Sequence, residues 1–66
     1  MASFNDKITI SEDWLKACGQ ENRIGHLWTI DKVQLMPNPD EFLYHVTDDT
    51  DGYSWVVWSI RGVVRV

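Results

Sequence analysis

The sequence predicts a mainly β protein with one short α-helix, built as a small curved antiparallel sheet or barrel of four or five strands. Short runs rich in β-branched and aromatic residues recur along the chain, and strong turn signals separate them. One polar-capped segment has helical spacing instead. With 66 residues the chain forms one domain, residues 1–66, and folding hides only roughly 60% of the unfolded chain's surface.

The first elements are a short strand at Ile8–Ile10 and a helix at about residues 12–18. Ser11 is a good N-cap, acidic residues follow it on the first turn, and Gly19 stands where a left-handed C-terminal cap belongs. Trp14, Leu15 and Cys18 share one apolar edge of this helix, which is expected to lie on the sheet. Cys18 is therefore expected to be a small core residue.

The segment His26 to Met36 alternates imperfectly between apolar and polar residues. Trp28 and Ile30 share one parity, whereas Val33 and Leu35 share the other. One extra residue in a strand reverses the direction of every later side chain. The sequence therefore predicts a bulge or bend near Asp31-Lys32.

Two more strands and a short final one follow a break at Pro37–Asp40, where neither proline can donate to a ladder. Phe42 to Thr47 and Tyr53 to Ile60 should form a hairpin across the acidic turn, and Val63 to Val66 a final strand beyond Gly62. Among small folds of this composition an SH3-like barrel is the first choice, and an open sheet with the helix on one face is the second.

The length of the acidic turn decides which tryptophan faces the core. A five-residue loop, Asp48–Gly52, places Trp58 inside and leaves Trp55 exposed, whereas a four-residue loop, Asp48–Asp51, does the reverse. We favour the five-residue loop, because it places Tyr53 and Ser59 with the exposed side chains. Adjacent odd and even positions cannot both face the core of one sheet, so one indole lies inside in either case.

The charge distribution bears on the partner. The net charge is −4, and residues 33–60 contain five acids and no Lys or Arg. Because Lys and Arg supply most of the affinity for nucleic acid, binding of DNA or RNA is disfavoured. An acidic surface favours a protein partner with a basic surface.

No catalytic or metal-binding motif is present, so the chain is predicted not to be an enzyme and to need no cofactor or metal. The Asp-rich turn lacks the closing Glu of a calcium loop, and the two histidines share no motif. No apolar run approaches the ~20 residues that span a membrane, and no signal peptide is evident. A cytoplasmic protein without membrane contact is expected.

The sequence thus predicts a non-enzymatic protein-binding module that uses an aromatic and acidic hairpin. Small acidic proteins of phages and mobile elements often block a host protein, so an inhibitor is the expected role, with DNA mimicry by the acids as one form of it. The alternatives are a small barrel that stacks single-stranded nucleic acid on aromatic rings, and an oligomer-forming structural protein. The predicted partner-binding residues are Leu43, His45, Asp48, Asp49, Asp51, Tyr53 and Trp55.

Overall fold

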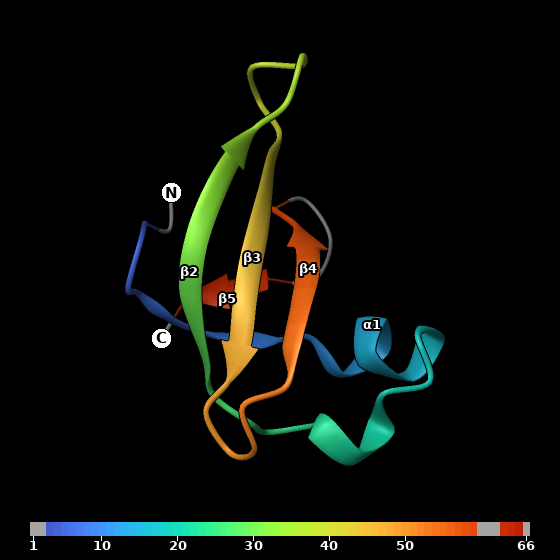
Figure 1. Cartoon of the computed structure of the whole chain (residues 1–66). Coiled ribbons are helices and arrows are strands. Elements are labelled where there is room, and N and C mark those ends of the chain that lie inside the picture. Colours follow the sequence, from blue (N-terminus) through green and yellow to red (C-terminus); the bar gives the residue numbers. More distant parts are fainter. Residues whose placement is uncertain (1–2, 60–62, 66) are drawn as a thin grey trace.

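The computed structural model describes residues 3–59 and 63–65 and contains one curled antiparallel sheet. The elements are β1 (Lys7–Ile10), α1 (Glu12–Ala17), the 3-10 helix η1 (Glu21–Arg23), β2 (Trp28–Leu35), β3 (Phe42–Asp48), β4 (Ser54–Trp58) and β5 (Val63–Arg65). The strand order is β4-β3-β2-β1-β5. Strands β2, β3 and β4 lie side by side, β1 and β5 cross behind them, and α1 lies beyond β4 (Figure 1). This half-barrel confirms the predicted mainly β fold. The ends of the last two predicted strands, Ile60 and Val66, and the Gly62 bend are outside the described residues.

Helix α1 begins and ends as its sequence predicts. The Ser11 hydroxyl accepts a hydrogen bond from the Trp14 N–H, which would otherwise lack a partner at the helix start. At the other end Gly19 has φ of 72°, and the Gly19 and Gln20 amides donate to the carbonyls of Lys16 and Leu15. These two bonds form a Schellman cap. The predicted helix therefore lies within a residue of its observed bounds.

Strand β2 contains the predicted irregularity. Its register with β3 shifts between Ile30 and Lys32, so Asp31 is the extra residue. Before the shift Ile30 faces the core opposite Val46, and after it Val33 faces the same side opposite Tyr44. The bulge thus reconciles the two parities of the sequence, because it returns the later apolar side chains to the inner face.

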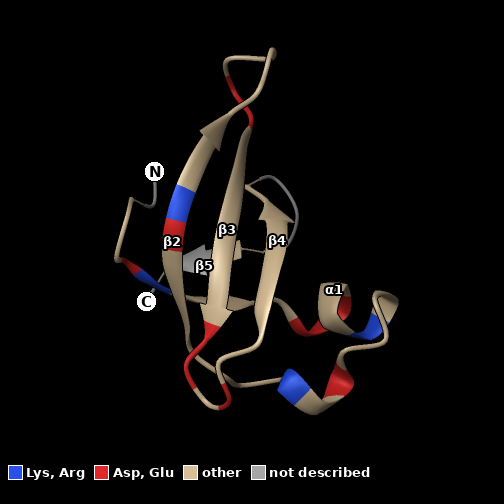
Figure 2. Cartoon of the chain, viewed as in Figure 1, with Lys and Arg blue, Asp and Glu red and all other residues tan. Residues whose placement is uncertain are grey.

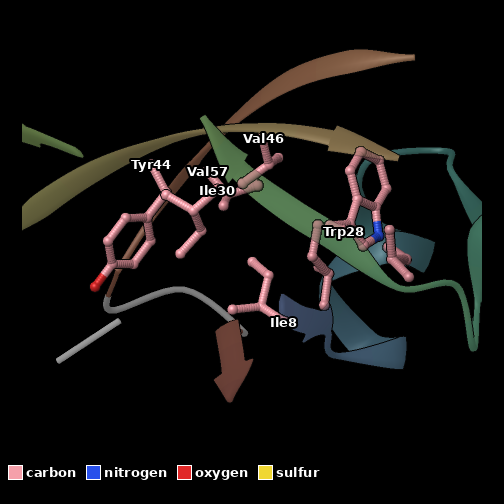
Figure 3. Packing of buried hydrophobic residues seen from close by; sticks show 8 residues of the cluster. Ile8, Trp28, Ile30, Tyr44, Val46 and Val57 are labelled. Carbon is pink, nitrogen blue, oxygen red and sulfur yellow. The ribbon is translucent and has the colours of Figure 1, made fainter. Parts of the chain in front are cut away.

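The core fills the concave side of the sheet. In Figure 3, Tyr44 and Trp28 lie at opposite ends of the cluster, and Ile8 reaches it from β1. Leu15 is the fully buried residue of α1, so the helix closes the cluster from the side. The buried hydrophobic residues are Ile8, Ile10, Leu15, Trp28, Ile30, Tyr44, Val46 and Val57.

The hairpin register differs from the favoured prediction. Thr47 pairs with Ser54, Val46 with Trp55 and Leu43 with Trp58. The predicted five-residue loop is therefore wrong, and so is the placement of Trp58 in the core. Trp55 faces inward and packs against the core cluster, whereas Trp58 is 43% exposed.

The physical reason lies in where the loop begins. Asp48 continues β3, and its N–H donates to the Tyr53 carbonyl across the last pair of the hairpin. Four residues, 49–52, then make the turn, and the Gly52 N–H donates to the Asp48 carbonyl. Gly52 has φ of 77°, a conformation that glycine adopts without steric cost.

Candidate protein-binding site at the β4 edge

An apolar patch lies on the outer face of β3 and β4. Val56 opposes His45 and Trp58 opposes Leu43, and these four residues are here called the outer patch. Val56 is 41% exposed and Trp58 43% exposed, while Leu43 and His45 are half-buried. Side chains on one face of paired strands lie next to each other, so the four form one continuous surface.

Polar contacts fix the rest of this outer face. The His45 Nε2 lies 3.0 Å from the Gln34 Oε1 of β2; since an amide oxygen can only accept, Nε2 carries the hydrogen of this bond. Farther down the face the Thr47 hydroxyl donates to the Asp31 carboxylate in the bulge. The outer patch is therefore bordered by oriented polar groups on its β2 side.

A groove continues the outer patch around the free edge of β4. It has a volume of about 420 Å³ and lies between α1 and β4. Its lining residues are Trp14, Cys18, Trp55, Val56, Val57 and Trp58. Val56 and Trp58 thus belong to both surfaces. Cys18, expected in the core, is instead exposed, because it is the C-cap residue just beyond the end of α1 and not part of the helix.

Asp48 lies beneath the acidic turn and has no exposed surface. Its Oδ2 accepts from Arg23 Nη1 at 2.6 Å and contacts His26 Nδ1 at 2.8 Å, and its Oδ1 accepts from the Thr50 N–H at 2.8 Å. Burial alone would raise the pKa of Asp48. The hydrogen bonds from His26, Thr50 and Arg23 outweigh it and lower the pKa to about 2.

Arg23 is the residue that organises the acidic turn. Its side chain is 11% exposed and also pairs with Asp51 at 3.0 Å. The guanidinium lies 4.1 Å from the centre of the Tyr53 ring and 5.9 Å from a Trp28 ring, within cation–π range. No role for Arg23 is predicted from the sequence. The only signal in the sequence is the crowding of three aspartates within four residues; the need for a nearby cation follows once the structure shows that Asp48 is buried.

The other carboxylates of the turn are also engaged within the chain. Asp49 accepts from Lys7 Nζ at 2.7 Å and from the Thr29 hydroxyl at 2.6 Å. Hydrogen bonds from Lys7 and Thr29 lower the pKa of Asp49, and those from Arg23 and the Tyr53 N–H lower the pKa of Asp51. Internal cations therefore offset much of the charge that DNA mimicry would use.

The predicted partner-binding residues are thus divided between two places. Leu43 and His45 lie in the outer patch as predicted, but β4 supplies Val56 and Trp58 to it in place of Tyr53 and Trp55. Tyr53 is 38% exposed and has Arg23 stacked over its ring. Trp55 packs against Trp28 with ring centroids 5.8 Å apart, and its remaining surface lines the groove. Asp48 is buried, and Asp49 and Asp51 are exposed at the turn.

Among residues 3–59 and 63–65, no group of three or more histidine, cysteine or acidic side chains is arranged to hold a metal ion. The same part of the chain contains no helix long and apolar enough to cross a membrane. No protein-family model, curated protein or solved structure matches this chain. Its function is therefore inferred from its own geometry.

Proposed function

We propose that this protein is a non-enzymatic protein-binding module whose contact surface is the outer patch together with the groove at the β4 edge. The observation that carries the proposal is the exposure of Val56 and Trp58 beside Leu43 on one rigid sheet face. Exposed apolar patches of this kind mark interaction sites. Trp is the residue type most enriched among those that dominate interface energies.

The charge pattern favours a partner with a basic surface. Residues 33–60 contain no Lys or Arg, and acids lie at the chain turns on either side of the patch (Figure 2). Acidic surroundings speed the approach of a basic protein and disfavour an acidic one. Occupying a basic surface of the partner would block other ligands of that surface, so inhibition is the activity we expect from such binding.

The test is partner capture from cell lysate with matched variants. Trp58→Ser removes the exposed indole of the outer patch and is expected to abolish capture. Leu35→Ala is the control, because Leu35 is 76% exposed but shares the parity of Val33, so it lies on the opposite face of the sheet from the outer patch. If Trp58→Ser captures the same proteins as the wild type, the proposed surface is wrong.

A further inference from the structure

We infer that the free edge of β4 accepts an extended segment of the partner as an additional strand, one with aliphatic residues at its centre and Lys or Arg at both ends. This inference rests on the proposed function and specifies how the partner is held. It starts from the sheet order, in which β4 is an outermost strand. Edge strands present unpaired backbone groups that can template another strand.

The hydrogen-bond pattern shows which groups of β4 are available. The Asp48 N–H donates to Tyr53, and the Ser59 N–H donates to Phe42. In an antiparallel ladder every second residue of a strand is hydrogen-bonded to the same neighbour. Trp55 and Val57, which lie at this spacing between Tyr53 and Ser59, are therefore also bonded to β3. The N–H and C=O groups of the remaining β4 residues, Ser54, Val56 and Trp58, therefore point away from β3. No other described strand pairs with this edge.

Both sides of this edge are apolar, as an added strand requires. Successive side chains of a strand point to opposite faces. One set of incoming side chains would lie on the outer patch beside Val56 and Trp58. The other set would enter the groove of about 420 Å³ and contact Trp14 and Trp55. A segment of alternating aliphatic residues fits both environments.

The charges around the edge select the ends of that segment. β4 itself carries no charged residue (Figure 2). Asp40 and Glu41 precede Phe42, whose N–H donates a hydrogen bond to the Ser59 hydroxyl just beyond β4. Asp13 lies on α1, which lines the groove through Trp14, and Glu21 lies on η1, the element that follows α1 in the chain. None of these four carboxylates forms an ion pair with a described residue.

The same charges disfavour a second copy of this chain as the occupant. Two-fold antiparallel pairing of β4 would place the end near Asp40 and Glu41 against the partner's end near α1. Each copy has a net charge of −4, so acids would face acids across the new pair. A segment with basic ends replaces this repulsion by attraction.

The experiment selects short random peptides, displayed as a library, on the immobilised wild-type chain. Enriched peptides are expected to alternate aliphatic residues and to carry Lys or Arg at their ends. Val56→Pro removes one outward N–H from an edge position where proline is tolerated and should weaken their binding at least about tenfold. Val56→Thr keeps that N–H and the branched shape, so it is the matched control and should bind much more tightly than Val56→Pro.

N-methylated peptides provide a second test that does not depend on folding of a variant. Methylation of every second backbone nitrogen should abolish binding when it removes the N–H groups that face β4. It should leave binding intact when it removes the N–H groups on the other edge, because only one edge of the peptide pairs with β4. Failure to enrich peptides, equal loss in both parities, or concentration-dependent dimers paired through β4 in sedimentation would each overturn the inference. If Trp58→Ser abolishes partner capture but Val56→Pro does not, the proposed function stands and strand addition fails.

Discussion

Asp48→Asn should reveal how much the buried charge cluster under the acidic turn stabilises the fold. The substitution keeps the shape of the side chain but removes its charge. Asp48 uses Oδ1 for the Thr50 N–H and Oδ2 for Arg23 and His26. An amide has only one acceptor oxygen, so in either orientation its NH₂ group faces a donor, from Thr50 or from Arg23.

The expected cost is about 3 kcal/mol. Breaking a buried ion pair by removing one partner costs roughly 3–5 kcal/mol, and Arg23 retains its contact with Asp51, which favours the lower end. A chain of 66 residues has a total stability of about 3–10 kcal/mol. The variant should therefore lose a large part of its free energy of unfolding.

The pH dependence gives an independent check with a definite sign. The folded-state pKa of Asp48 is about 2, below its ordinary value of 3.8, so its contribution is fully present above that ordinary value and is lost as the pH falls through the folded value. The depressed pKa corresponds to roughly 2 kcal/mol. The pKa values of Asp49 and Asp51 are also lowered, so protonation of these two residues adds to the loss of stability at low pH. Both residues remain in the variant.

Urea unfolding followed by tryptophan fluorescence measures both effects. Asp48→Asn should lower the free energy of unfolding at pH 7 and should lose less stability than the wild type between about pH 5 and pH 2. Asp40→Asn is the matched control, because the Asp40 side chain is exposed and forms no ion pair with a described residue. A variant within 0.5 kcal/mol of the wild type at pH 7, roughly the size of an ordinary surface effect, would refute the role assigned to Asp48.

Three further substitutions test the hairpin register, its turn and the helix cap. Val57→Ala should lower the free energy of unfolding by about 2 kcal/mol because Val57 is buried, whereas Trp58→Ser on the outer face should lower it much less. The opposite order in urea unfolding would restore the five-residue loop. Gly52→Ala should cost about 1 kcal/mol, since φ is 77° there and a Cβ strains that conformation; an unchanged melting temperature would contradict this. Ser11→Ala should cost about 1 kcal/mol by removing the acceptor for the Trp14 N–H, and helical circular dichroism that is unaffected during thermal unfolding would count against the cap.

Local chemistry was enough to predict several elements. Ser11 and Gly19 determine where α1 begins and ends, since each satisfies backbone groups within a few residues. The opposite parities of Ile30 and Val33 required a bulge at Asp31, because a pleated strand alternates strictly. Leu43 and His45 were placed on the outer face for the same reason.

The site on β4 could not be predicted in the same way. Placing Trp55 inside and Trp58 outside depends on the register of β4 against β3, and in the structure Asp48 is the last residue of β3 in that register. The side chains that bind the Asp48 carboxylate there, Arg23 and His26, are more than 20 residues away in the sequence. Asp48 has the sequence context of an exposed turn, but it is buried beside Arg23 and His26, which only the folded chain brings close to it.

The sequence by itself thus determined a small, mainly β domain with one capped helix, a bulged strand and an acidic turn, because these follow from alternation, capping and backbone preferences over short distances. Only the tertiary structure decided that Val56 and Trp58 form the exposed surface and that a groove lies between α1 and β4. The reason is that a shift of one residue in a hairpin reverses both faces of a strand, and the register observed here comes with contacts of Asp48 to Arg23 and His26, which are distant in the sequence.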